Sequence, residues 1–458
     1  MVVGVVLCSL AAQWPAIADD EDTTLPIMAA CRPDTAPVLP ERWHAVGLML
    51  PLLRQQLVVG DFLYDGSISA MRATLYGLES GSVDLLITAA QTYQINGPAD
   101  APESCTALGK LYSPPSTRWL AKDPVCDGEA PVGGKKVQWW KTPDADGRAE
   151  WQWYTSDRRL PWRTMFSHRV TEPAVIGDYG ITYFPTFESV TQTPLPQLQQ
   201  FCTAHLRQPD PKQATAKTAD DLMTLAPAIG DRASRVKSLI PGLSLNACKS
   251  LEAARWPNRY VMTAILSPIP VKFTPLPTML FYDWEDAGKL YAYLYEARTQ
   301  PPKIEMVSVL TKGVGYGLER LPNGTFACAA RSPGTVRPDW MRVAGCECKG
   351  VIEHNAQFGA HEVSQIRACP VKGEGLHVNW SWYTTDGRPI LFAEPDAIGM
   401  GLNVADYYRW MPDEAMPPEA FDLPAQCTRA EEVGLPAVGD GLPAASTANC
   451  SDCHTTRQ

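Results

Sequence analysis

The sequence predicts a mainly β protein of two tandem antiparallel half-barrel repeats, followed by a linker and a short C-terminal segment. Three observations support this fold class. Aromatic motifs recur in the same order in both halves of the chain, cysteines recur in order beside them, and β-rich runs outnumber helix-compatible segments. We expect the first repeat at 19–204, the second at 205–428, and the linker with the C-terminal segment at 429–458.

The clearest internal match is a Trp-x-Trp-Tyr motif. Trp151–Asp157 reads WQWYTSD and Trp380–Asp386 reads WSWYTTD, and a proline follows each within four residues. Phe62–Asp65 matches Leu280–Asp283 in the same order. The offset between the halves drifts from 218 residues (64 to 282) to 229 (153 to 382), as small loop insertions would produce. Self-similarity of this kind indicates a duplicated structural unit.

The cysteines form a second repeated series among the 13 in the chain. The matched pairs are Cys31 with Cys248, Cys105 with Cys328, Cys126 with Cys346, and Cys202 with Cys427. Cys348 and Cys369 have no counterpart in the first half, which predicts an inserted loop with its own disulfide. We therefore expect five disulfides, two in each repeat and one private to the second. The sequence leaves the connectivity within each set of four open.

Local patterns favour strands over helices. Runs of strand length and β-rich composition occur at His44–Leu52, Asp84–Thr88, Tyr260–Ser267 and Ile304–Leu310. The Trp-x-Trp-Tyr motifs alternate as strands with one buried face do, so we expect their tryptophans inside, as core or as the wall of a ligand cavity. The most helix-compatible segments are Asp220–Ala226 and Asp286–Arg298.

The N-terminal residues predict export. Val2–Ala12 is a mostly apolar run, Ala16–Ala18 is a small-x-small cleavage site, and four acidic residues follow at once. This is typical of a signal peptide at 1–18, although no Lys or Arg precedes the apolar run. A buried N-terminal strand is the alternative. Export places the chain in the periplasm or at the cell surface, where cysteines form disulfides.

The order of these motifs resembles that of the ependymin and LolA-like superfamily. The resembling stretches are about 44–202 and 260–427: Tyr-Asp on a strand, a cysteine, a tryptophan segment, Trp-x-Trp-Tyr, a proline and a final cysteine. The resemblance implies an antiparallel sheet folded around one side of an apolar cavity. It also implies a lipid or other hydrophobic molecule as ligand, and it carries over no catalytic residue.

The C-terminal segment holds the strongest chemical motif. Cys450, Cys453 and His454 form C-x-x-C-H, which in an exported protein is the attachment site of c-type haem. The two thiols reach the two vinyl groups of one porphyrin, and the histidine lies under the iron as its axial ligand. The segment resembles the N-terminal part of a class I cytochrome c domain. The sequence therefore predicts covalent haem c as cofactor.

Four residues follow His454, so the place of a sixth iron ligand stays open. One interpretation is a truncated cytochrome c domain. A second is a pendant haem whose sixth ligand comes from the repeats or from a partner. A third is a small disulfide between Cys450 and Cys453, or a zinc site that would be one protein ligand short.

Composition argues against two classes of function, nucleic-acid binding and membrane spanning. Forty basic and 50 acidic residues give a net charge of -10, which disfavours a nucleic-acid partner, and no apolar run is long enough to span a membrane. The leading hypothesis is electron transfer through haem to a redox partner protein. The alternative is a secreted carrier of a hydrophobic small molecule. A haem enzyme ranks below both.

Asp65 and Asp283 occupy matching positions and are the candidates for paired catalytic acids. We favour a structural explanation for them, in which each bonds to backbone or to a nearby arginine such as Arg72. The sequence accordingly predicts no catalytic residue, and an electron carrier or binding protein rather than an enzyme.

Overall fold

The computed structural model describes most of the two repeats. The described residues are 28–31, 36–51, 56–77, 81–98, 101–115, 124–132, 135–143, 149–155, 160–165, 180–214, 216, 221–223, 232–245, 248, 257–269, 275–284, 289–295, 303–311, 314–333, 346–353, 363–370, 378–385, 388–395, 402–412 and 427.

The strands form two sheets of twelve strands each. The strands of the first sheet (sheet one) are β1 (Arg42–Leu50), β2 (Val58–Asp65), β3 (Ala70–Gly77), β4 (Ser82–Thr88), β5 (Thr92–Asn96), β6 (Ser104–Ala107), β7 (Val125–Val132), β8 (Lys135–Pro143), β9 (Ala149–Thr155), β10 (Pro161–Met165), β11 (Ile181–Ser189) and β12 (Leu206–Arg207). The strands of the second sheet (sheet two) are β13 (Leu243–Leu245), β14 (Arg259–Ile269), β15 (Leu276–Asp283), β16 (Lys289–Tyr295), β17 (Ile304–Thr311), β18 (Val314–Arg320), β19 (Phe326–Pro333), β20 (Glu347–Ile352), β21 (Ser364–Pro370), β22 (Val378–Thr384), β23 (Pro389–Pro395) and β24 (Leu402–Pro412).

Eleven strands follow the same order in both sheets, which confirms the predicted duplication. The twelfth strands differ, because β12 lies beside β6 in sheet one, whereas β13 lies beside β20, the counterpart of β7, in sheet two. From one edge, sheet one runs β7-β8-β9-β10-β11-β1-β2-β3-β4-β5-β6-β12. From the equivalent edge, sheet two runs β13-β20-β21-β22-β23-β24-β14-β15-β16-β17-β18-β19. In each, the first long strand lies mid-sheet between the second and the last, as β1 does between β2 and β11. Within the described residues the two edge strands of a sheet do not pair with each other. The fold is therefore mainly β, with two tandem open sheets that are antiparallel except where the short β12 pairs in parallel with β6.

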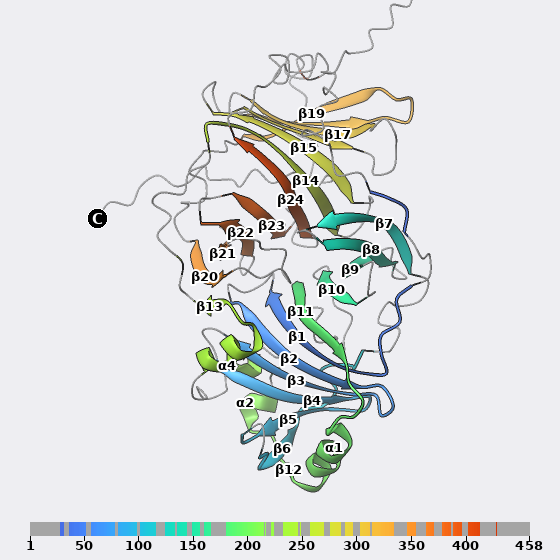
Figure 1. Cartoon of the computed structure of the whole chain (residues 1–458), viewed down its shortest axis with the longest axis vertical. Coiled ribbons are helices and arrows are strands. Elements are labelled where there is room, and N and C mark those ends of the chain that lie inside the picture. Colours follow the sequence, from blue (N-terminus) through green and yellow to red (C-terminus); the bar gives the residue numbers. More distant parts are fainter. Residues whose placement is uncertain are drawn as a thin grey trace, which may run out of the picture.

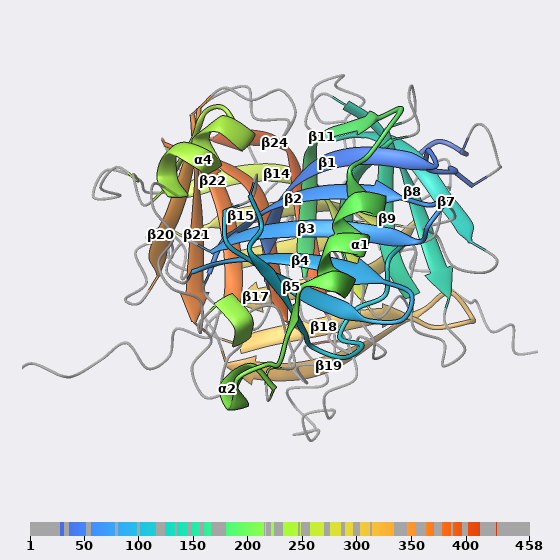
Figure 2. The same cartoon turned by 90° about the horizontal axis from the view of Figure 1, so that it is seen from below.

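The two sheets are stacked along the molecule. β1–β6 lie at one end with the helix α1 (Leu195–Ala204), β14–β19 lie at the other end, and β7–β10 and β20–β23 flank the middle (Figure 1). Seen from below, α1 crosses the strands β2–β5 (Figure 2). The described helices also include α2 (Pro211–Ala214) and α4 (Arg232–Leu239), which lie between the two sheets in sequence.

The described residues form four apolar clusters, one of which packs α1 on sheet one through Leu86, Leu195 and Cys202. The sheet-one core includes Trp43, Phe62, Leu85 and Trp140, and the sheet-two core includes Val261, Phe281, Val307 and Leu318. A third cluster, the inter-sheet core, combines both repeats and includes Leu48, Trp139, Ile366, Trp380 and Trp382. Apolar burial is the main favourable term in folding, so the inter-sheet core joins the two sheets energetically.

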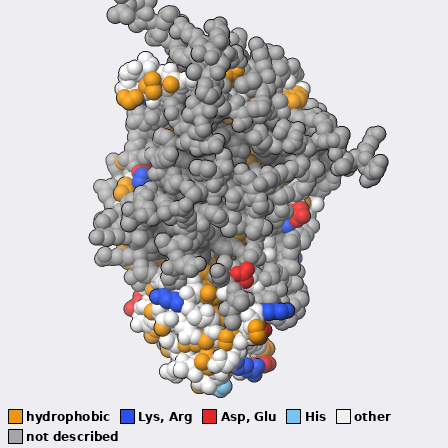
Figure 3. Space-filling model, turned by 180° about the vertical axis from the view of Figure 1, so that it is seen from behind, with side chains coloured by type: hydrophobic (Ala, Val, Ile, Leu, Met, Phe, Trp, Pro, Cys, Tyr) orange, Lys and Arg blue, Asp and Glu red, His pale blue; other side chains and the backbone are white. Residues whose placement is uncertain are grey.

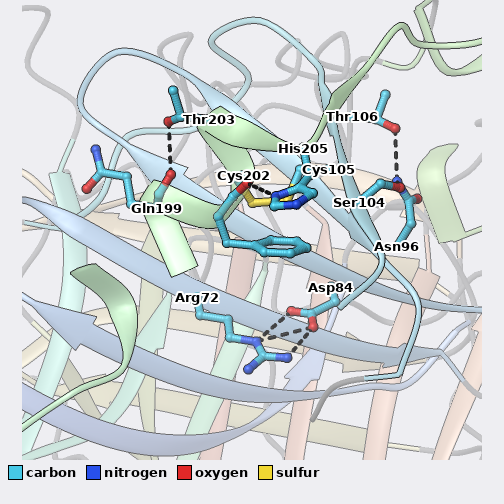
Figure 4. The surroundings of a disulfide bond; sticks show 11 residues. Arg72, Asp84, Asn96, Ser104, Cys105, Thr106, Gln199, Cys202, Thr203 and His205 are labelled. Atoms are coloured by element: carbon cyan, nitrogen blue, oxygen red, sulfur yellow. Dashed lines mark hydrogen bonds and ion pairs between the residues drawn. A yellow bond between two sulfur atoms is a disulfide. The ribbon is translucent and has the colours of Figure 1, made fainter. Parts of the chain in front are cut away.

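Five disulfides join all ten cysteines between residues 31 and 427, as the sequence predicts. The pairs are Cys31–Cys126, Cys105–Cys202, Cys248–Cys348, Cys328–Cys427 and Cys346–Cys369. Two pairs in each repeat therefore correspond, and Cys346–Cys369 is private to the second. Figure 4 shows Cys202 of α1 bonded to Cys105 of β6.

The match of Cys126 with Cys346 was wrong, because Cys126 corresponds to Cys348. Each of these two is the second residue of its strand, in β7 and β20, and the pairing register shifts after each at Gly128 or Gly350. At Gly128 φ is 152°, and an added Cβ would lie 2.7 Å from Met28 Cε, so a side chain is excluded there. The order of the cysteines along the chain could not distinguish Cys346 from Cys348, because only Glu347 separates them.

The helical interpretation of Asp286–Arg298 was also wrong. Lys289–Tyr295 forms β16, which pairs with β15 on one side and β17 on the other. A place between two strands satisfies the backbone of the segment and overrides its local helix preference. Of Asp220–Ala226, the structure describes residues 221–223, which are helical.

Candidate functional site

The predicted haem residues lie outside the described part of the chain. This applies to Cys450, Cys453 and His454, and to the signal peptide at 1–18. These assignments, and the domain bounds given above, therefore stay predictions. The disulfides still bear on them, because every described cysteine has a described partner. No described thiol is left to pair with Cys450 or Cys453.

Asp65 and Asp283 are held in matching ion pairs. Arg42 Nε donates to Asp65 Oδ2 at 3.0 Å, and Arg259 Nε donates to Asp283 Oδ2 at 3.1 Å. Burial alone would raise the pKa of Asp65, but hydrogen bonds from Ser67, Thr193 and Arg42 outweigh it and lower this pKa. The predicted bond to an arginine is therefore confirmed. The arginine named, Arg72, was wrong.

Arg72 pairs instead with Asp84 of the neighbouring strand. Its Nη2 lies 2.5 Å from Asp84 Oδ2, and its Nε lies 3.0 Å from Asp84 Oδ1 (Figure 4). Both side chains are largely buried between β3 and β4. The pair neutralises two charges inside the sheet and leaves Asp65 to Arg42.

Aromatic side chains and one arginine occupy the inter-sheet core. The rings of Tyr183 and Trp382 meet edge to face with centroids 5.5 Å apart, and Trp380 Nε1 donates to the Pro51 carbonyl at 2.6 Å. Arg163 is fully buried there and donates from Nη1 to the Tyr183 hydroxyl at 3.0 Å. The prediction that the tryptophans of the second motif lie inside is confirmed. The side chains of Trp151 and Trp153 are outside the described part.

A buried glutamine of sheet one has its polar atoms fully engaged. Gln138 on β8 donates from Nε2 to Glu129 Oε2 at 3.2 Å, and its Oε1 accepts from Trp140 Nε1 at 3.2 Å. Glu129 pairs in turn with Lys136. Gln138 is opposite Glu129 on β7 and opposite Tyr154 on β9. This face of the sheet is therefore polar inside but internally satisfied.

Sheet two places a second buried glutamine in the same register. Gln365 on β21 is opposite Val351 on β20 and opposite Tyr383 on β22, so it corresponds to Gln138. Its side chain is buried, but neither Nε2 nor Oε1 has a hydrogen-bond partner among the described residues. The two partners of Gln138 are replaced, because Val351 stands in the position of Glu129 and Arg367 in that of Trp140. An unpartnered buried polar group costs about 1–3 kcal/mol.

Three further polar side chains share this face of β21 and β22. Arg367 is opposite Ser381, and Tyr383 is opposite Gln365, so the four side chains form a compact polar patch. Within the described residues, Ser381 Oγ and Arg367 Nε have no hydrogen-bond partner and Arg367 forms no ion pair with a carboxylate. Burial raises the pKa of Tyr383, and the nearby Arg367 opposes this rise. We call this set the Gln365 patch.

A half-buried histidine on sheet one lies between two carboxylates. His44 Nε2 is 2.7 Å from Asp61 Oδ1, and its Nδ1 is 3.1 Å from Glu188 Oε1. Arg235 of α4 approaches the other oxygen of Asp61 at 3.4 Å. The hydrogen bond to Asp61 raises the pKa of His44, and partial burial opposes it. This group connects β1, β2, β11 and α4.

Within the described residues, no three His, Cys, Asp or Glu side chains cluster as a metal site would require. In the same part of the chain, no helix combines the length and the apolar character that crossing a membrane demands. On the face seen in Figure 3, most of the described atoms lie at the bottom of the view, with smaller groups at the top and sides, and hydrophobic side chains are mixed with charged ones.

Comparison with known proteins gives only remote structural similarity. No protein-family model matches the chain, and no curated protein matches it. An uncharacterised conserved protein of Thermus thermophilus is 12% identical, covers 37% of this chain and 92% of its own, and has a TM-score of 0.25. The MucA/MucB complex structure of Pseudomonas aeruginosa is 12% identical over 62% of this chain and 84% of that chain, with a TM-score of 0.20.

A LolA superfamily protein of Nitrosomonas europaea also matches. It is 6% identical, covers 38% of this chain and 93% of its own, and has a TM-score of 0.18. Scores this low say nothing about function. The description of the two sheets rests on their own strand pairing.

Proposed function

We propose that this chain is a binding protein whose second sheet takes a hydrophobic or amphiphilic molecule. The observation that carries the proposal is the Gln365 amide, buried in a register where sheet one supplies both partners of Gln138. Buried polar groups in stable proteins find hydrogen-bond partners. A partner for Gln365 that is not part of the described chain, namely a ligand, accounts for the difference. The LolA and ependymin resemblance of the sequence gives the same expectation.

Ligand uptake tests this proposal directly. The full chain, exported from a bacterial host, is extracted with organic solvent and titrated with N-phenyl-1-naphthylamine, which fluoresces in apolar sites. We expect saturable uptake that Gln365→Leu weakens and the matched change Gln138→Leu in sheet one leaves in place. Native mass spectrometry before extraction would show the natural ligand as added mass. Absence of both uptake and added mass overturns the proposal.

A second candidate function is electron transfer through covalently bound haem. Its support is the complete C-x-x-C-H motif at Cys450, Cys453 and His454. The donor set fits the group, because two thiols and one imidazole are what c-type attachment requires. The ten described cysteines are paired among themselves, so none of them competes for the two motif thiols. Haem would supply a one-electron redox centre, and the partner would be a redox protein.

Haem staining tests the second candidate. The protein is made in a periplasm that contains the c-type haem maturation machinery and is run on a denaturing gel. We expect stain on the denatured chain and a reduced α-band, both lost in the double variant Cys450→Ala/Cys453→Ala. A colourless wild-type chain with these two cysteines oxidised to each other would exclude the haem function and leave ligand binding untouched.

A further inference from the structure

We propose that the Gln365 patch binds the carboxylate of an amphiphilic molecule, such as a fatty acid. This inference rests on the proposed ligand-binding function and names the class of ligand. Three observations support it: the charge of Arg367, the hydrogen-bond donors of Gln365 and Ser381, and the row of residues that continues from the patch across sheet two.

The charge of the patch selects an anion. Arg367 is half-buried, and no carboxylate of the described residues pairs with it. A guanidinium binds a carboxylate through two parallel hydrogen bonds, and burial strengthens that interaction. Tyr383 lies beside it and is neutral, because burial raises the pKa of its hydroxyl. A positive charge with no counter-ion of its own favours a ligand that brings one.

The remaining polar atoms suit the two oxygens of a carboxylate. Gln365 Nε2 and Ser381 Oγ are donors without partners in the described structure, and both side chains are buried. Together with Arg367 they present donors from two adjacent strands on one face. The donors outnumber the acceptors, so a group with acceptor oxygens fits the patch better than an alcohol or an amine.

The same face of the sheet becomes apolar next to the patch. Strand pairing continues the row from Arg367 and Ser381 to Phe392 on β23, then through β24 to Leu266 on β14 and Leu276 on β15. Leu266 and Leu276 are buried. Five steps between neighbouring strands span about 24 Å, the scale of an extended acyl chain. The row therefore offers a polar end for a headgroup and an apolar length for a chain.

Sheet one explains why the patch is specific to sheet two. At the corresponding positions sheet one has Glu129, Gln138 and Trp140, which bond to one another and leave no charge for an anion. The two glutamines share a register, but only the one in sheet two keeps free donors beside a cation. The buried amide of sheet one is thus bonded to side chains of its own repeat, whereas the buried amide of sheet two has no partner among the described residues.

Palmitate and hexadecanol form the matched pair of probes, since they differ in the headgroup alone. Affinities of the extracted full chain are measured for both by competition against N-phenyl-1-naphthylamine. We expect palmitate to bind at least tenfold more tightly than hexadecanol. Arg367→Met, which keeps the apolar stem, removes this preference, and Ser381→Ala reduces it. Arg320→Met, a change of another half-buried arginine on sheet two, preserves it.

The outcomes separate this inference from the broader function. Equal binding of both probes by the wild type overturns the carboxylate site but keeps a hydrophobic ligand. Loss of the preference in Arg320→Met as well as Arg367→Met overturns the assignment to the patch. Failure to bind either probe, with N-phenyl-1-naphthylamine uptake also absent, overturns both proposals. If Arg367→Met does not fold, Ser381→Ala decides, because an unchanged preference there contradicts the site.

Discussion

His44 makes the stability of sheet one depend on pH. Asp61 and Glu188 hold its two ring nitrogens, and the hydrogen bond to Asp61 raises the pKa of His44 in the folded state. The pKa of an unperturbed histidine is about 6.5. The stabilisation is therefore complete below that value and is lost as the pH rises through the folded-state pKa. We expect the free energy of unfolding to fall as the pH rises above about 6.5.

Urea unfolding at several pH values checks this expectation. His44→Gln should flatten the pH dependence above about pH 6.5, and the same substitution at the exposed His205 is the matched control. Arg235 on α4 and Arg72 on β3 stay charged in this range, because hydrogen bonds raise their pKa values further. Burial raises the pKa of Asp84, and His44→Gln retains Asp84, so the difference between the two proteins reports His44. An equal slope in wild type and His44→Gln would contradict the assignment.

The two buried glutamines predict opposite effects for one substitution. Gln138→Leu removes both hydrogen bonds and leaves the Glu129 carboxylate short of a donor, so we expect a loss of about 2–3 kcal/mol. Gln365→Leu removes an amide without described partners, so in ligand-free protein we expect no loss or a gain of about 1 kcal/mol. Urea unfolding of both variants measures this. Similar losses at both positions would mean that Gln365 is satisfied after all.

At the residue scale, sequence reasoning missed this pair for a definable reason. Gln138 precedes its Trp-x-Trp-Tyr motif by 13 residues (138 to 151), but Gln365 precedes its own by 15 (365 to 380). Cross-strand register, not spacing along the chain, makes them equivalent. In a strand where polar and apolar residues alternate, a glutamine is predicted to be exposed. That prediction fails where both faces of the sheet are buried, as at Gln138 and Gln365.

The private disulfide supports the edge of sheet two that carries the Gln365 patch. Cys369 lies two residues after Arg367, and Cys346 lies two residues before Cys348, which is opposite Arg367. It closes a loop of 23 residues, worth about 3 kcal/mol by chain entropy. We expect Cys346→Ala/Cys369→Ala to lose about that much stability and to weaken palmitate binding. Unfolding curves and the probe competition measure both.

The matched control removes a disulfide that both repeats share. Cys328–Cys427 closes a loop of 99 residues, so Cys328→Ala/Cys427→Ala should cost more, about 5 kcal/mol. Its sulfurs lie on β19 and at residue 427, away from β20 and β21 in the strand order. Loss of palmitate binding in this variant alone would show that the private disulfide does not support the patch.

For single elements, the sequence predicted correctly those strands whose local pattern is β-like, and it failed for the strand whose local pattern is helical. The runs at His44–Leu52 and Tyr260–Ser267 overlap β1 and β14, because apolar residues of strand length mark a buried strand whatever its neighbours. Asp286–Arg298 failed, because its local preference is helical and only pairing with β15 and β17 makes it a strand. Local signals succeed where local and tertiary preferences agree.

At the scale of the whole molecule, the duplication was predictable and the packing of the two copies was not. Repeated motifs state that one fold occurs twice, but they carry no information on which faces meet. The inter-sheet core draws Leu48 and Tyr183 from the first repeat and Ile366, Trp380 and Trp382 from the second. In the sequence these residues look like the core of their own sheets. The haem motif stays a prediction; it differs in kind, since its chemistry needs three residues at fixed local spacing and no information on packing.

The inter-sheet core predicts that the two sheets unfold together. Trp382 is buried, contacts Tyr183 across the boundary and donates from Nε1 to Ser364 Oγ at 2.7 Å. Trp382→Ala should cost about 3–5 kcal/mol, as large buried aromatics do. Because this loss falls on the boundary, we expect the single calorimetric transition of the wild type to separate into two.

Trp43→Ala is the control, because Trp43 is equally buried but belongs to the sheet-one core, where it stacks on Tyr64 at 5.3 Å. It should lower the transition without dividing it, since the boundary is intact. Two transitions already present in the wild type would mean that the inter-sheet core does not couple the sheets. A single transition in Trp382→Ala, lowered as in Trp43→Ala, would show that the coupling is spread over the whole boundary. Joint unfolding in the wild type would also tie the Gln365 patch on sheet two to the stability of sheet one, so that a ligand bound there would stabilise both.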